Sequence, residues 1–191
     1  IMLKTEIRVI AWDDCAFSFR QKRVLILGTI FRGGSFLDGL LSTRIDKDGN
    51  DATERIANAI LTTRHYDQLS YIMLDGITLA GFNVVDIRSL SKRTKLPVIA
   101  IQRKKPNMKE FLGALKKLAD HKKKMESVKV AGKFFRFGLG EKEILYQRAG
   151  INNEECRDLL NITCIRSNIP EPLRVAHLIA SGLSGESRGG A

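Results

Sequence analysis

Two aspartates stand directly after apolar, strand-like segments, where their carboxylates could bind a metal ion together. Asp13 follows the segment 7–12, and Asp75 follows the short apolar segment 70–74. Ligands in open α/β sheets bind at the carboxyl ends of parallel strands, and neighbouring strands lie roughly 4.8 Å apart. Two unpaired carboxylates at that separation repel each other unless a proton or a cation lies between them. Hard oxygen ligands of this kind suit Mg²⁺ or Mn²⁺.

Two further aspartates are candidates for the same site. Asp14 could replace Asp13 as the ligand, because successive residues of a strand point to opposite faces. Asp51 precedes an expected helix that leads into the fourth strand, and it could supply a third carboxylate. Asp51 and Glu54 also have the spacing of a helix capping box, and spacing alone favours the capping role.

The three histidines differ in their surroundings. His65 and His121 lie in polar stretches that are typical of surface segments. His177 lies beside alanine and leucine in the segment 170–177, and a lone histidine there is more often a core residue than a ligand. The residues alone therefore leave the role of His177 open.

The elements that must position these residues are three strands followed by alternating helices and strands. Strands are expected at 7–12, 23–31, 36–45, 70–74 and 97–101, helices at 51–61, 83–94, 107–118, 152–160 and 171–183, and two further short strands at 134–137 and 143–147. Continuous apolar strands beside helices predict a sheet covered on both faces. We expect an α/β fold with a mixed sheet of about five strands, three antiparallel and then two parallel. This order resembles the ribonuclease H-like fold.

The chain has 191 residues, which fits a single domain spanning 1–191. Its Gly- and Ser-rich tail, 184–191, is expected to fray. No apolar run is long enough to cross a bilayer, and no signal peptide is recognisable at the start. The three cysteines form no CxxC pair, which favours a reducing cytoplasm over a disulfide scaffold or a zinc cluster.

The chain is strongly basic, with 32 Lys and Arg against 21 Asp and Glu and a net charge of +11. Such an excess indicates a polyanionic partner or a merely solvated surface, and composition does not decide between them. The run 103–105 follows a buried strand, which favours a functional role. The run 122–124 lies on an expected helix end, where solvation is the simpler interpretation.

Several motifs resemble an uncharacterised, largely archaeal protein family related to endonuclease V. The shared motifs are Asp13-Asp14, Arg32-Gly33-Gly34, Leu74 to Ile77, Ala80 to Asn83 and the stretch from Pro170 to Ser181. This resemblance covers nearly the whole chain. It implies a ribonuclease H-like fold and by itself gives no activity.

The more distant resemblance to endonuclease V implies roles for individual residues. That enzyme cuts DNA or RNA near deaminated adenine, using Mg²⁺. Its first-strand aspartate resembles Asp13, and its Asp-Gly after the fourth strand resembles Asp75-Gly76. The strand 96–103 is similar to one that ends in an active-site lysine, which places Arg103 at that position. The segment 170–177 resembles the one that ends in the fourth catalytic residue, so His177 becomes a predicted ligand.

The chain departs from the endonuclease V pattern in two places. The Arg-Glu pair before the first helix has no literal match, and Asp51 is the best placed substitute, with Glu54 a weaker one. The Tyr-Pro-Gly segment that opens the strand beside the lesion is not recognisable. Cleavage could therefore persist without specificity for inosine.

Together these features predict a metal-dependent nuclease that acts on DNA or RNA, with no membrane partner. The predicted ligands of Mg²⁺ or Mn²⁺ are Asp13, Asp51, Asp75 and His177, with Asp14 and Glu54 as second choices, and Arg103 and Lys104 are the predicted phosphate ligands. The main alternative is a protein that binds nucleic acid on the same fold without cutting it. A third is a hydrolase of small phosphorylated substrates, which a closed pocket in place of an open basic groove would favour.

Overall fold

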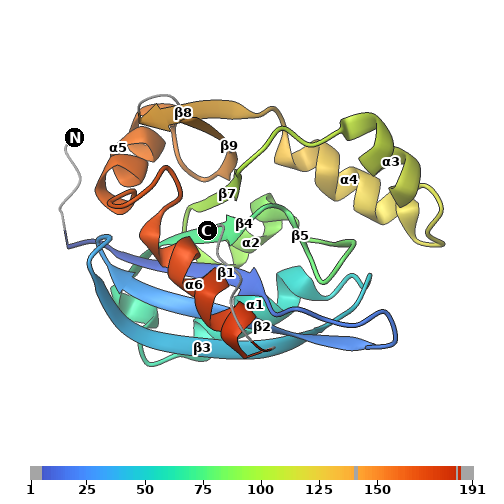
Figure 1. Ribbon diagram of the computed structural model, residues 1–191, viewed down its shortest axis with the longest axis horizontal. Helices are drawn as coiled ribbons and strands as arrows, with labels where there is room; N and C mark the ends of the chain where they lie inside the picture. Colours follow the sequence, from blue (N-terminus) through green and yellow to red (C-terminus); the bar gives the residue numbers. More distant parts are fainter. Residues whose placement is uncertain (1–5, 140–141, 184, 186–191) are drawn as a thin grey trace.

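The protein is built around one mixed sheet of seven strands with helices on both faces (Figure 1). The computed structural model describes residues 6–139, 142–183 and 185, so the tail predicted to fray lies outside the described residues apart from residue 185. The strand order is β3-β2-β1-β4-β7-β9-β8. A separate two-stranded hairpin, β5-β6, follows β4. The predicted α/β class and mixed sheet are confirmed, with two more strands than the predicted five.

The elements follow one another in this order: β1 (Arg8–Asp14), β2 (Arg23–Arg32), β3 (Phe36–Asp46), α1 (Ala52–Thr62), the 3-10 helix η1 (Tyr66–Gln68), β4 (Leu69–Asp75), β5 (Thr78–Leu79), β6 (Asn83–Val84), α2 (Ile87–Thr94), β7 (Val98–Gln102), α3 (Met108–Leu115), α4 (His121–Ala131), β8 (Phe135–Leu139), β9 (Lys142–Ala149), α5 (Asn153–Thr163) and α6 (Glu171–Gly182). The first three strands pair antiparallel, and β1, β4 and β7 run parallel. The two strands that were predicted as possible additions, β8 and β9, extend the sheet antiparallel beyond β7.

The central strands are buried on both faces, because their side chains alternate between two separate cores. In β1, Ile10 and Trp12 pack in the core that contains α1 and α2. Val9 and Ala11 pack in the opposite core, which contains α5. The continuous apolar strands follow from this double cover.

Close packing at the end of β1 requires a glycine on the neighbouring strand. Gly28 pairs with Trp12 in the β1–β2 register. A Cβ atom added to Gly28 would lie 3.0 Å from the Trp12 indole, so a larger residue would have to displace a ring that is fully buried. This contact fixes the strand end just before Asp13.

The helix predicted to begin at residue 83 begins later. Asn83 and Val84 form strand β6, which pairs with β5. Asp86 then caps α2, where its Oδ1 accepts a hydrogen bond of 2.9 Å from the backbone N–H of Ser89. The cap and the hairpin together place the helix start at Ile87. No helix among the described residues is long and apolar enough to cross a membrane.

Candidate metal centre

Asp13 and Asp75 end two adjacent parallel strands. The β1–β4 register pairs Trp12 with Leu74, so the two aspartates are the next residues along each strand. Asp13 lies two residues after Ala11, and Asp75 lies two residues after Met73, so each aspartate points to the same face of the sheet as that apolar residue. Both carboxylates therefore extend toward the face that carries α6. The expected proximity of these two residues is therefore observed.

The chain turns sharply after Asp75, in a backbone conformation that favours glycine. Gly76 has a φ of 77°, a conformation that strains residues with a Cβ atom. Its N–H donates a hydrogen bond of 2.7 Å to the carbonyl of Ile101 on β7. The Asp-Gly pair thus fixes the strand end that carries the carboxylate.

His177 reaches the two aspartates from α6, which lies across β1 and β2 (Figure 1). The buried Thr29 hydroxyl on β2 donates a hydrogen bond of 2.8 Å to the carbonyl of Pro172, which anchors the first turn of α6 to the sheet. Arg174 donates two hydrogen bonds to the Glu171 carboxylate in the same turn. With the helix held in this way, His177 Nδ1 lies 2.9 Å from Asp13 Oδ2.

Asp13, Asp75 and His177 form a group that could hold a metal ion. Each offers one ligand atom, and these atoms all lie within 4.8 Å of one another. Adjacent ligand atoms of an octahedral ion with bonds of about 2.1 Å are about 3 Å apart, close to the 2.9 Å between His177 Nδ1 and Asp13 Oδ2. Two carboxylate oxygens and one imidazole nitrogen form a donor set that accepts Mg²⁺ or Mn²⁺. The residues present therefore fit a divalent cation.

The electrostatics of this cluster favour a bound proton or cation. Burial, and secondarily the negative charge of Asp75, raise the pKa of Asp13 to about 7, although its hydrogen bond with His177 opposes the shift. Burial also raises the pKa of Asp75, against the opposing charges of Arg103 and His177. Closely spaced carboxylates with raised pKa values are typical of functional sites.

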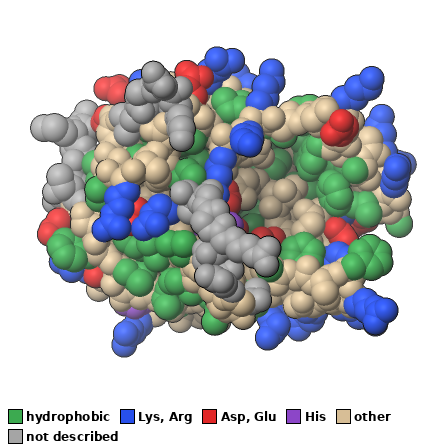
Figure 2. All heavy atoms as spheres, viewed as in Figure 1, with side chains coloured by type: hydrophobic (Ala, Val, Ile, Leu, Met, Phe, Trp, Pro, Cys, Tyr) green, Lys and Arg blue, Asp and Glu red, His purple; other side chains and the backbone are tan. Residues whose placement is uncertain are grey.

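Arg103 lies beside the acidic cluster at the end of β7. Its Nη2 is 3.6 Å from Asp75 Oδ2, and both side chains are about a quarter exposed. Arg103 and Lys104 line a shallow hollow of about 280 Å³ together with Asp13, Asp14 and Asp75. On the face that carries α6, acidic side chains and a histidine come to the surface near the middle, with basic side chains on several sides (Figure 2). The hollow is open to solvent rather than enclosed.

Asp14 lines the same hollow but has a separate structural contact. Its Oδ2 accepts a hydrogen bond from the backbone N–H of Ala80, in the tight turn between β5 and β6. Burial raises its pKa, and the charge of Asp75 adds to the rise. Strand alternation thus selects Asp13 rather than Asp14 for the contact with His177.

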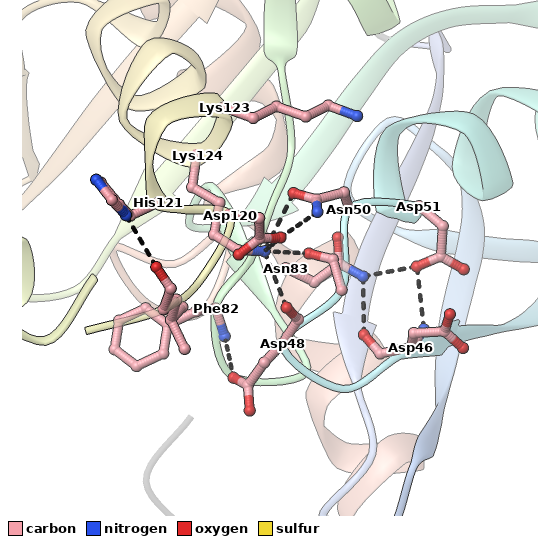
Figure 3. A network of polar contacts seen from close by, with 12 residues as sticks. Asp46, Asp48, Asn50, Asp51, Phe82, Asn83, Asp120, His121, Lys123 and Lys124 are labelled. Carbon is pink, nitrogen blue, oxygen red and sulfur yellow. Dashed lines mark hydrogen bonds and ion pairs between the residues drawn. The ribbon is translucent and has the colours of Figure 1, made fainter. Parts of the chain in front are cut away.

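Asp51 does not join the cluster, contrary to the prediction. Its Oδ1 accepts hydrogen bonds from the backbone N–H of Asp46 and from the side-chain amide of Asn83 (Figure 3). Arg55 is its ion-pair partner. Asp51 makes no side-chain cap to α1, because the Asn83 side chain accepts the N–H of Ala52 instead. Glu54 lines a different hollow, between α1 and α4.

Lys124 is buried, so the solvated helix end predicted for 122–124 is wrong at this residue. Its ammonium donates to the carbonyls of Asp48 and Gly49 and to Asn50 Oδ1, and Asp120 lies 3.2 Å away (Figure 3). A lysine that is 1% exposed is stable only with such partners. Lys124 therefore fastens α4 to the loop that precedes Asp51.

Two residues of the hollow were not anticipated. Thr78 and Gln102 line it next to Asp75 and Arg103. Gln102 is the polar residue that ends an otherwise apolar strand, which is the same signal that identified Asp13 and Asp75.

Comparison with known proteins places the chain in a family. A family model described as endonuclease dU matches residues 5–184, which is most of the chain. The chain belongs to the endonuclease dU family. Its curated relatives include a UPF0215 protein of Methanosarcina barkeri, 49% identical over 98% of this chain and 96% of the relative. Another, from Methanothermobacter thermautotrophicus, is 49% identical over 99% of this chain and 94% of the relative.

Solved structures include one similar in sequence and others that share the fold. A protein of unknown function from Archaeoglobus fulgidus has a TM-score of 0.85 and 37% identity, over 93% of this chain and 98% of that one. Ciona intestinalis endonuclease V, in complex with a DNA containing inosine, has a TM-score of 0.59 and 12% identity over 91% and 84% of the two chains. The catalytic domain of human endonuclease V has a TM-score of 0.56 and 15% identity over 91% and 80%. Because these sequence identities are low, the likeness shows that this chain shares the fold of endonuclease V and shows no more than that.

Proposed function

We propose that this member of the endonuclease dU family is a metal-dependent nuclease that hydrolyses phosphodiester bonds in DNA or RNA. The observation that carries the proposal is the cluster of Asp13, Asp75 and His177, whose ligand atoms lie within 4.8 Å of one another. This cluster stands at the carboxyl ends of two parallel strands, where α/β sheets bind their ligands. The family description and the endonuclease V fold support the same assignment.

The residues of the cluster and the two basic residues beside it would have different roles. Asp13, Asp75 and His177 would hold Mg²⁺ or Mn²⁺, which supplies charge neutralisation at the phosphate and makes a water molecule more acidic. Without the ion, the hydrogen bond between His177 Nδ1 and Asp13 Oδ2 holds the imidazole ring toward the aspartates, and a bound cation would take the place of the shared proton. Arg103 presents a planar fork of donors at the edge of the hollow, a geometry that suits a phosphate. Lys104 adds a second positive charge beside it.

A cleavage assay tests the proposal. Purified protein is incubated with Mg²⁺ or Mn²⁺ and with strands that carry one deoxyuridine, one inosine or no modification. Deoxyuridine is the first base to try, because of the name given to the family. We expect cleavage that EDTA abolishes and that Asp75→Ala lacks. Equal cleavage by wild type and Asp75→Ala would assign the activity to a contaminant.

A second candidate function is binding of nucleic acid without cleavage. Asp51 is hydrogen-bonded to Asn83 and is not part of the metal-binding group. That group, as found among the described residues, therefore has two carboxylates and one histidine. Fewer carboxylates hold a divalent cation less tightly. Salt-sensitive binding of the strands, with no turnover in any divalent metal, would favour this function.

A further inference from the structure

An aromatic side chain stands exposed in the loop between β1 and β2. Phe19 is 93% exposed, more than any other large hydrophobic residue that the structure describes. The loop begins directly after Asp14, where β1 ends, and projects beyond that end of the sheet (Figure 1). Phe19 follows Asp13 by six positions, so the two Cα atoms are at most roughly 20 Å apart. The ring is therefore within reach of a strand that binds at the metal centre.

Hydrogen bonds fix the backbone of this loop. The N–H of Gln21 donates a hydrogen bond of 3.1 Å to the carbonyl of Ser18, which closes a β-turn with Phe19 and Arg20 at its tip. Lys47, which follows β3, donates a hydrogen bond of 2.9 Å from its ammonium to the carbonyl of Phe19. Turns of this kind favour Gly, Pro, Asn, Asp and Ser. An exposed phenylalanine at the tip therefore has no evident role in folding.

The surroundings of the ring are basic. Lys47 Nζ lies 4.3 Å from the centre of the Phe19 ring, in a cation–π contact. The segment 15–22 also carries Arg20 and Lys22, both exposed, and no acidic residue. Figure 2 shows hydrophobic and basic side chains together at the end of the molecule where this loop lies. Charge complementarity therefore favours a polyanion as the partner, and the exposed ring favours one that carries flat apolar groups.

We propose that the β1–β2 loop binds a single strand of nucleic acid, with an unpaired base stacked on Phe19. This inference rests on the proposed function. Any base can stack on an aromatic side chain because each has a π face, and basic residues beside the ring contact the phosphates. At a rise of about 3.4 Å per nucleotide, roughly 20 Å corresponds to about six nucleotides. The loop thus holds the strand up to about six nucleotides from the bond that is cut, without regard to sequence.

A tryptophan in place of Phe19 tests the stacking directly. Trp12 is the only tryptophan of the chain and is fully buried, so the indole added in Phe19→Trp reports on the loop against a constant background. In EDTA, unmodified single strands of DNA and RNA of about 20 nucleotides should quench its fluorescence, because a stacked base contacts the indole. Inorganic polyphosphate, which has the charge without the bases, should not quench it.

Phe36 offers a matched control. It is also exposed and also lies beneath a cation, with the guanidinium of Arg32 5.2 Å from the centre of its ring. Phe36 pairs with Arg32, and Arg32 pairs with Arg8, so this ring lies at the end of the sheet where β1 begins. The fluorescence of Phe36→Trp should therefore not respond to either strand.

The affinity for single strands gives a second readout, measured by fluorescence anisotropy in EDTA. Phe19→Ala should weaken binding at least roughly fivefold, the effect of losing one stacked base, and Phe36→Ala should bind as wild type does. The slope of log K against log salt concentration should stay the same in Phe19→Ala, because no phosphate contact is removed. A blunt duplex, whose bases are covered, should bind Phe19→Ala and wild type equally.

The outcomes separate this inference from the proposed function. An absence of quenching in Phe19→Trp by either strand, or wild-type affinity in Phe19→Ala, would overturn the inference and leave any metal-dependent cleavage standing. A blue shift of the Phe19→Trp fluorescence with anionic phosphatidylserine vesicles, without a response to the strands, would overturn it in favour of a membrane surface. Quenching and weakened binding as expected, with no cleavage in any metal, would instead overturn the nuclease function and leave the stacking site standing.

Discussion

His177 and Asp13 are separated by 164 positions in the chain, yet His177 Nδ1 lies 2.9 Å from Asp13 Oδ2. Helix α6 makes this contact possible because its first turn is anchored to β2 through Thr29 and Pro172. The pairing joins the end of the chain to the first strand of the sheet. It also completes the only three-residue donor group found among the described residues.

Removal of the imidazole should weaken metal binding without unfolding the protein. We expect His177→Ala to raise the Kd for Mn²⁺ by at least roughly 10–100-fold, because loss of even a supporting group commonly has an effect of that size. Calorimetric titration measures the change. His65→Ala, at a histidine outside the cluster, should bind Mn²⁺ as wild type does. An unchanged Kd in His177→Ala would remove this residue from the metal centre.

The metal-free protein should lose stability as the pH rises toward neutrality. The pKa of Asp13 is about 7 in the folded protein and near 3.8 in the unfolded chain, so between these values the folded state holds the extra proton. The stabilisation of the folded state by this proton is fully present below about pH 3.8, and it is lost as the pH rises through about 7. The loss is on the order of a few kcal/mol, since one pKa unit corresponds to about 1.4 kcal/mol.

Urea unfolding in EDTA from pH 5 to pH 8 measures this slope. Asp13→Asn should reduce the slope, because the carboxyl with the pKa of about 7 is gone, whereas Asp14 and Asp75, whose pKa values burial also raises, remain. Saturating Mg²⁺ should restore the stability of wild type at pH 8, because the cation replaces the proton, and should have little effect on Asp13→Asn. A wild-type slope that Asp13→Asn leaves unchanged would show that other groups cause it.

Asp51 should affect stability and leave metal binding intact. Asp51→Ala removes the acceptor for the Asp46 N–H and the Asn83 amide, at a cost of about 1–3 kcal/mol. A chain of this length loses about 2–4 °C in Tm for each kcal/mol. The exposed Asp67→Ala is the control and should change the Tm little. A large loss of Mn²⁺ affinity in Asp51→Ala would show that Asp51 is a metal ligand, as the sequence predicted.

The roles of Asp13 and Asp75 could be predicted from the sequence because each follows an apolar strand, and the parallel pairing of β1 and β4 brings such positions together. The role of Asp51 could not, because it depends on Asn83, which lies 32 positions away and takes over the cap of α1. The burial of Lys124 likewise depends on carbonyls 74 to 76 positions away. Local spacing carries no information on such distant partners.

Arg103 should contribute to nucleic-acid binding in a salt-dependent way. Arg103→Ala should weaken binding to all strands alike and reduce the slope of log K against log salt concentration by about 1, as expected for one lost phosphate contact. Lys92→Ala, on α2 and outside the hollow, changes the net charge equally and should leave both quantities near the wild-type values. Equal effects of the two variants would indicate a nonspecific response to net charge.

A crystal structure of the protein soaked in Mn²⁺ would show directly whether the three residues hold an ion. We expect an anomalous-scattering peak bonded to Asp13, Asp75 and His177, at ligand distances of about 2.1–2.2 Å. The peak should disappear in Asp75→Asn. A well-ordered soaked crystal with no peak among these three residues, or with the ion bound elsewhere, would show that they do not form the metal centre.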